Sequence, residues 1–123
     1  MIDTSEHDRL RAFLLELEER GVVSDLARVY ALELLDAMIS RHAIGLPYTG
    51  VSRERNHGVN MSWRVMHGRH LDVDVGWDGG IEWFYRDTPA DITMCDFDPV
   101  PLAELGDRFW TAVRHMTTEK TNA

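Results

Sequence analysis

Three polar side chains alternate with apolar ones along a short segment in the middle of the chain. His70, Asp72 and Asp74 are each separated by one residue, so an extended strand would point all three to the same face. Imidazole and carboxylate groups are common ligands of zinc and manganese. A metal-dependent hydrolase is therefore one hypothesis, although the segment lacks the H-E-x-x-H spacing or the cysteine pairs that make a metal site specific.

Other catalytic groups have weaker support in the sequence. The single cysteine, Cys95, lies near Met94 and Phe97, where a thiol usually packs as a small hydrophobic group. The glycines of residues 76–80 suit a hairpin turn, because no helix is expected to follow them and form a phosphate site. We therefore favour a protein that is not an enzyme and needs no cofactor, with the metal-dependent hydrolase kept as an alternative.

Two apolar side chains fall on a face that is otherwise expected to be polar. Strand alternation places Met66 and Phe84 on this outer face, in the company of Arg64, Asp72 and Arg86. An aromatic ring surrounded by arginines and acids has the composition of the centre of a protein interface. These five residues are the candidate protein-binding site.

The candidate site requires an antiparallel sheet, and the clearest pattern in the chain predicts one. Apolar and polar residues alternate over 59–66, 70–75 and 81–86, which is typical of strands with one buried face. Glycines between the three segments suit tight hairpin turns. The expected core positions are Val59, Met61, Trp63, Val65, Leu71, Val73, Val75, Ile81, Trp83 and Tyr85, with Trp77 and Trp110 also expected in the core.

Charge pairing favours one register for the two hairpins. In that register, Arg64 and Arg86 lie on either side of Asp72 and form ion pairs with it. The alternative register of the second hairpin places Asp74 opposite Glu82, and directly opposed like charges are destabilising. We therefore expect Asp72 to lie between the two arginines.

Amphipathic helices are expected before and after the meander. Apolar residues recur with helical spacing in two segments before it and one after it. The predicted elements are helices over 6–20, 24–41 and 102–117, a loop over 45–58, and a meander over 59–97 in which 91–97 would add a fourth, edge strand. Because an apolar sheet face needs a cover, we predict an α+β two-layer sandwich in one domain, residues 1–123. Three helices would cover one face of a three- to four-stranded antiparallel meander, in the order α-α-β-β-β-(β)-α.

The predicted meander is similar to the core of a family of small, uncharacterised bacterial α+β proteins. Their pattern is G-R-x-L-[DE]-x-[DE], then D-G, then [IV]-E-aromatic. The matching segments here are Gly68-Arg69-His70-Leu71-Asp72-Val73-Asp74, Asp78-Gly79 and Ile81-Glu82-Trp83. The family has no assigned activity that the resemblance could transfer to this chain. Because such proteins look like accessory products of mobile or defence-linked operons, the resemblance implies an accessory or inhibitor-like factor of a bacterium or phage that binds another protein.

Composition limits the remaining classes of function. The chain has 123 residues, of which 44% are hydrophobic and 28% charged, and a net charge of -8 at pH 7, which is typical of one globular domain. Such a charge argues against direct binding to nucleic acid. The many acids of residues 71–107 permit an acidic mimic of nucleic acid as a second alternative.

The sequence also predicts a location and an assembly. We find no apolar run of the ~20 residues that span a membrane, and no apolar leader at the N-terminus. A single cysteine suits a reducing compartment, so we expect a cytoplasmic protein without membrane contact. Because an unpaired edge strand over 91–97 invites pairing with another chain, we expect a homodimer in addition to an unidentified protein partner.

Overall fold

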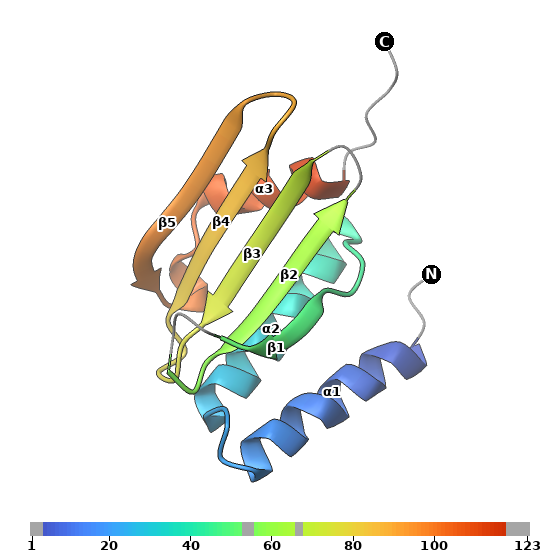
Figure 1. Cartoon of the computed structure of the whole chain (residues 1–123), viewed down its shortest axis with the longest axis vertical. Coiled ribbons are helices and arrows are strands. Elements are labelled where there is room, and N and C mark those ends of the chain that lie inside the picture. The colour runs from blue at the N-terminus through green and yellow to red at the C-terminus, as the bar shows by residue number, and fades with distance from the viewer. Residues whose placement is uncertain (1–3, 53–55, 66–67, 118–123) are drawn as a thin grey trace.

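The protein is built from a sheet layer and a helix layer (Figure 1). The computed structural model describes residues 4–52, 56–65 and 68–117. The described elements are α1 (Thr4–Glu19), α2 (Asp25–His42), β1 (Tyr48–Val51), β2 (Val59–Val65), β3 (Arg69–Val75), β4 (Ile81–Asp87), β5 (Ile92–Val100), a 3₁₀ turn (Leu102–Glu104) and α3 (Asp107–Thr117). The strands form one antiparallel sheet in the order β1-β2-β3-β4-β5.

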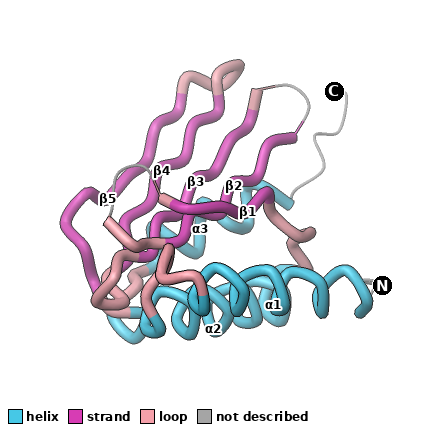
Figure 2. Tube along the Cα trace, turned by 60° about the horizontal axis from the view of Figure 1, so that its bottom comes forward, coloured by secondary structure: helices cyan, strands magenta, loops and turns pink. Residues whose placement is uncertain are grey.

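The helices gather on one face of the sheet, with α1 beside α2 (Figure 2). This arrangement confirms the predicted α+β class and antiparallel sheet. The described sheet has five strands where the sequence predicts three or four, because β1 forms inside residues 45–58, which are predicted to be a loop. β1 has four residues, too few to show the alternation that identifies a strand. Within the described ranges, no helix combines the length and apolar character needed to cross a membrane.

Local signals set the boundary between α1 and α2. Gly21 follows α1 with φ of +74°, a left-handed conformation that glycine adopts without strain. The Ser24 hydroxyl caps α2 by accepting a hydrogen bond from the Ala27 N–H at 3.0 Å. The same hydroxyl donates to the Trp77 carbonyl at 2.7 Å. The cap therefore also ties the start of α2 to the turn between β3 and β4.

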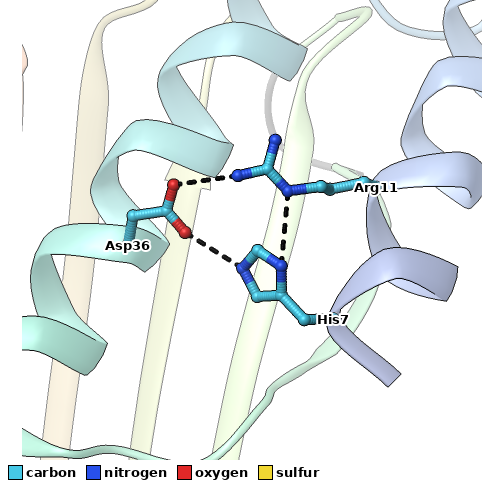
Figure 3. Close-up of polar contacts among 3 residues, drawn as sticks. All are labelled: His7, Arg11 and Asp36. Carbon is cyan, nitrogen blue, oxygen red and sulfur yellow. Dashed lines mark hydrogen bonds and ion pairs between the residues drawn. The ribbon is translucent and has the colours of Figure 1, made fainter. Parts of the chain in front are cut away.

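Three polar side chains connect α1 with α2 (Figure 3). His7 Nε2 lies 3.0 Å from Asp36 Oδ1, and Arg11 donates to Asp36 Oδ2 at 3.2 Å and to His7 Nδ1 at 3.3 Å. Because the Arg11 Nε can only donate, His7 Nδ1 must accept, so the ring proton lies on Nε2 and is donated to Asp36. This closed set of contacts holds α1 against α2, together with the buried Leu14 and Leu17.

The register of both hairpins differs by two residues from the one that charge pairing predicts. Asp72 lies opposite Ser62 and Phe84 instead of the two arginines. Asp74 lies opposite Glu82, the pairing that the prediction avoids. The register prediction is therefore wrong, but each side chain keeps its predicted face because faces repeat every two residues along a strand.

Turn geometry explains the observed register. Val65 pairs with Arg69, which leaves Gly68 as the last of three intervening residues, and Gly68 has φ of +85°. That position of a three-residue hairpin turn takes a left-handed residue. The predicted register would place Arg69 there instead, at a cost of about 1–2 kcal/mol. A cross-strand charge pair contributes about 0.2–1 kcal/mol, so the turn decides the register.

The second hairpin repeats this turn. The Gly76 N–H donates to the Gly80 carbonyl at 2.8 Å, and the Gly79 N–H donates to the Gly76 carbonyl at 2.9 Å. Gly79 is again the last of three enclosed residues and has φ of +86°. Asp78 Oδ1 accepts from the Gly80 N–H at 2.9 Å and stabilises the turn.

Neighbouring donors stabilise Asp74 opposite Glu82. The Ser52 hydroxyl and the Asn60 amide donate to Asp74 Oδ1 at 2.8 Å and 3.1 Å. Such hydrogen bonds to a carboxylate are among the stronger ones in proteins. Ser52 directly follows β1, the strand that the sequence does not predict. The formation of β1 therefore also positions a donor that offsets the repulsion between Asp74 and Glu82.

β5 runs beyond the predicted edge strand. The sequence predicts a strand over 91–97 followed by a turn, but pairing continues to Val100. Ile81 pairs with Val100 whereas Trp83 pairs with Asp96, so β5 carries extra residues in a bulge. Pro99 lies in this bulged part of an edge strand, where its missing N–H is tolerated.

The buried face of the sheet is the predicted one, except that Val65 at the end of β2 is 38% exposed and does not lie in the core as predicted. Val73 and Trp83 are 0% and 4% exposed, and the Trp83 ring meets Phe109 of α3 edge-on at 5.5 Å. Trp77 is 59% exposed, so its predicted core position is wrong. Trp77 lies in the β3–β4 turn, where strand alternation does not apply. Trp110 packs partly buried on α3.

Candidate functional site

The outer face of the sheet, turned away from α2 and α3, carries the candidate residues (Figure 1). Strand pairing arranges its side chains in cross-strand rows. We name them the basic row (Arg64, His70 and Arg86), the central row (Ser62, Asp72 and Phe84) and the acidic row (Asn60, Asp74 and Glu82). The face therefore changes from positive to negative along the strands, with Phe84 in the row between.

Asp72 makes its closest polar contact within β3. Its Oδ2 lies 2.7 Å from His70 Nε2, and the Ser62 hydroxyl lies 3.3 Å from the same nitrogen. The His70 ring meets Phe84 edge-on, with 6.5 Å between the ring centres. Asp72 is thus satisfied by a histidine of its own strand, and not by the two arginines as predicted.

Arg86 is held by the β4–β5 hairpin. Its guanidinium donates to Thr93 Oγ1 at 2.6 Å and to Asp91 Oδ1 at 3.0 Å. The Asp91 carboxylate is exposed, so the ion pair contributes at most about 1 kcal/mol of stability. Its effect is to orient the guanidinium at the basic end of the outer face.

Arg64 differs from Arg86 in its surroundings. Its side chain is exposed and has no hydrogen-bond or ion-pair partner among the residues that the structure describes. Arg64, His70, Phe84 and Arg86 together line a hollow of about 340 Å³ at the basic end of the face. Four of the five candidate residues therefore lie on one face of the sheet: Arg64, Asp72, Phe84 and Arg86. Met66, the fifth, lies outside the described residues.

β5 adds two side chains that sequence reasoning missed. Cys95 is half-buried directly opposite Phe84. Phe97 follows two residues later and is 65% exposed, in the bulged part of β5 where strand alternation does not fix its face. Alternation of apolar and polar residues is the signal that could have placed these two side chains. It is weak in β5, because both sides of this edge strand are partly exposed and its apolar residues do not separate onto one side.

The geometry gives little support to the metal hypothesis. His70 and Asp72 are in contact, but Asp74 Oδ1 is bonded to Ser52 and Asn60 instead. Within residues 4–52, 56–65 and 68–117, no three side chains of His, Cys, Asp or Glu are grouped so that they could hold a metal ion. His70, Asp72 and Asp74 share one face of the strand as alternation predicts, but their side-chain atoms do not meet at one point.

A polar cluster lies on the inner face at the same end of the sheet as the basic row. Arg69 and Asp87 are buried opposite each other on β3 and β4, and Arg69 donates to the His115 carbonyl of α3. The buried Tyr85 hydroxyl has no hydrogen-bond partner among the described residues. Burial raises the pKa of Tyr85, Asp87 raises it further, and Arg69 opposes the shift. The cluster anchors the end of α3 to β3 behind the candidate site.

Comparison with known proteins adds no activity to this geometry. The chain matches no protein-family model, no curated protein and no solved structure. The segments that suggested a resemblance in the sequence lie on β3, the β3–β4 turn and β4, which are part of the scaffold of the outer face. The function must therefore be inferred from that face and from the edges of the sheet.

Proposed function

We propose that this protein is a non-enzymatic protein-binding module that uses the outer face of its sheet. The observation that carries the proposal is the outer face itself, which no described helix covers and on which the Phe84 ring lies among charged side chains. Arg64, Asp72 and Arg86 surround this ring with donors and acceptors of both signs. An aromatic centre with a charged rim is the composition of many protein interfaces.

The role that fits this face is that of an accessory or inhibitor-like factor in the cytoplasm of a bacterium, or encoded by a phage. The resemblance of the meander to small bacterial proteins supports it. The net charge of -8 supports a protein partner over direct contact with nucleic acid. The partner is expected to place an apolar group over Phe84 and charged groups over the two outer rows.

Crosslinking from the outer face tests the proposal. A photoreactive amino acid in place of Phe84 is expected to capture the partner in the native host. The same amino acid in place of Leu15, which is 43% exposed on α1, is the matched control and is expected not to. With the captured partner purified, Phe84→Ser and Arg86→Gln are each expected to weaken binding by at least about fivefold, and Leu15→Ser by less than about twofold.

Two results would contradict the proposal. An equal loss of affinity in Leu15→Ser and Phe84→Ser would mean that the outer face is not the binding surface. Salt provides the second measurement, because the screening length falls from ~10 Å at 0.1 M to ~3 Å at 1 M. An interface centred on Phe84 is expected to keep most of its affinity over this range. A collapse of binding would favour the acidic mimic of nucleic acid.

A further inference from the structure

β1 leaves one end of β2 without a strand on that side. β1 and β2 pair from Val51 and Val59 to Tyr48 and Ser62. Residues 63–65 of β2 continue beyond this last pair, where they pair with β3 alone among the described strands. Figure 1 shows β2 reaching past β1 toward its arrowhead. The sheet therefore has a short free edge beside the basic row.

The hydrogen-bond pattern shows which backbone groups face this edge. The Ser52 N–H donates to the Gly58 carbonyl at 2.9 Å, so these residues form a hydrogen-bonded pair. Such pairs recur at every second residue of antiparallel strands. Ser62, opposite Tyr48, belongs to this series, and Arg64 is the next member on β2. The N–H and C=O of Arg64 consequently point toward the free edge, where they bond no described backbone group.

A groove of about 380 Å³ lies along the free edge. Its walls include Trp63 and Arg64 of β2, Leu46 from the segment before β1, and Met116 of α3. The Trp63 indole donates to the Gly45 carbonyl at 2.7 Å, which holds this segment at the groove wall. Apolar walls thus accompany a backbone donor and acceptor that both lack a partner within the described chain.

The charge of the groove comes from Arg64. Its side chain has no described partner, and it lines both the groove and the hollow on the outer face. Arg86 adds a second positive charge in the same row. Two acids near this row are already engaged, since Asp72 contacts His70 and Asp91 contacts Arg86. An acidic ligand group therefore complements this end of the sheet.

We propose that the groove binds an extended segment of a partner protein, which adds to the free edge of β2 in line with β1. The inference rests on the proposed protein-binding function and names the kind of segment that is bound. Strand addition at a sheet edge gains its affinity from backbone hydrogen bonds and its specificity from alternate side chains.

The register defines the sequence of the bound segment. Residues opposite each other in paired strands share a face, so the residue opposite Arg64 lies on the outer face beside the guanidinium. Its two neighbours point to the inner side, where the groove walls include Trp63 and Met116. We therefore expect an acidic residue between two apolar residues. The acid pairs with the Arg64 guanidinium, its backbone bonds the Arg64 N–H and C=O, and the apolar neighbours pack against the groove walls.

Titration with short peptides tests the inference. The probe is acetyl-Thr-Val-Glu-Val-Thr-amide, and the comparison peptide carries lysine in place of glutamate. In ¹H–¹⁵N NMR spectra, the glutamate peptide is expected to shift the Arg64 amide and Trp63 indole signals. It is also expected to slow hydrogen exchange of the Arg64 amide, because that N–H gains an acceptor. The lysine peptide is expected to bind at least about fivefold more weakly.

Three variants separate the contributions to binding. Arg64→Gln removes the charge but keeps the N–H, and is expected to weaken binding about tenfold. Arg64→Pro also removes the N–H, which faces the free edge and takes no part in the β2–β3 ladder, and is expected to abolish measurable binding. Arg108→Gln is the matched control. It changes an exposed arginine of α3 that lines neither the groove nor the hollow on the outer face, and is expected to stay within about twofold of the original protein.

Several outcomes would overturn the inference. Peptide binding that persists in Arg64→Gln and Arg64→Pro would do so, as would an unshifted Arg64 amide at millimolar peptide. If Arg64→Pro does not fold, Arg64→Gln and the exchange of the Arg64 amide decide the matter. A dimer that Arg64→Pro converts to a monomer would mean that a second copy fills the groove. If the peptide does not bind the groove but Phe84→Ser still weakens binding of the captured partner, the groove inference is wrong and the outer-face proposal stands.

Discussion

Single side chains on the outer face differ in what they offer a partner. Asp72 is engaged by His70, and Arg86 by the β4–β5 hairpin, whereas Arg64 has no partner within the described residues. A ligand can therefore bind Arg64 without breaking an existing contact. Replacing Arg64 is expected to change binding much more than folding, which makes it the most informative position for functional tests.

Tyr85 makes stability depend on pH in the alkaline range. Burial, assisted by Asp87, raises the pKa of the folded-state phenol above its usual value of 10.0. In the unfolded chain the phenol ionises at lower pH than in the folded protein. The stabilising contribution is therefore fully present below about pH 10 and is lost as the pH rises above it.

Tyr85→Phe tests both the buried hydroxyl and this pH dependence. Because the variant removes a buried group without a described partner, it is expected to raise the free energy of unfolding by about 1 kcal/mol at neutral pH. The decline above pH 10 is expected to become shallower. Urea unfolding on both sides of pH 10 measures both effects, with the exposed Tyr48→Phe as control. A less stable Tyr85→Phe variant would mean that the hydroxyl makes a stabilising hydrogen bond.

At the scale of elements, turns set the register of the sheet and its contact with the helices. Gly79 adopts a left-handed conformation in the β3–β4 turn. It also lies against α2, where a Cβ atom at this position would be 2.6 Å from Tyr30 Cδ2. Ser24 joins the same turn to α2 through the Trp77 carbonyl. One turn therefore positions β3, β4 and α2 relative to one another.

Gly79→Ala is expected to lower the free energy of unfolding by about 2–4 kcal/mol. Alanine is strained in the left-handed conformation, and its methyl group would overlap the Tyr30 ring. Gly50→Ala in β1 is the control, because its Cβ would meet no atom within 4 Å and its φ is not positive; its effect is expected to stay within about 0.5 kcal/mol. Equal unfolding midpoints in urea for the two variants would contradict the assigned turn.

At the scale of the whole molecule, the two edges of the sheet differ in length and in cover. β1 shields part of β2, whereas β5 presents nine residues at the other edge. Asp96, Asp98 and Pro99 discourage pairing along its second half, but residues 92–95 precede them. The net charge of -8 repels a second copy, although salt near 0.15 M screens that repulsion beyond ~8 Å.

We therefore predict a two-fold dimer through residues 92–95 of β5. Light scattering at micromolar concentration is expected to give twice the single-chain mass of 14.1 kDa. Thr93→Pro removes a backbone donor or distorts this edge and is expected to give a single-chain mass. Arg64→Pro changes the opposite edge and is expected to leave the dimer intact. A single-chain mass that persists on concentration would mean that β5 does not pair with another copy.

Much of the fold and part of the site could be predicted from local patterns. Alternation assigned the two faces of β2, β3 and β4, so it placed Phe84 among charged residues and Trp83 in the core. The helical spacing of apolar residues predicted the first two helices over 6–20 and 24–41, close to the observed Thr4–Glu19 and Asp25–His42. The pattern of an edge strand is weaker because neither side is fully buried, so β1 and the placement of Phe97 could not be predicted.

The sequence by itself determined which side of β2, β3 and β4 most residues face and where the first two helices lie, because these properties depend on neighbours a few residues away. Only the tertiary structure decided which strands lie opposite one another, and hence that Asp72 pairs with His70 and that Asp74 can face Glu82. It also decided that β1 begins only at Tyr48, opposite Ser62, and leaves the Arg64 backbone at a free edge. These features depend on contacts between distant segments, whose small energies are outweighed by the geometry of the turns that bring the segments together.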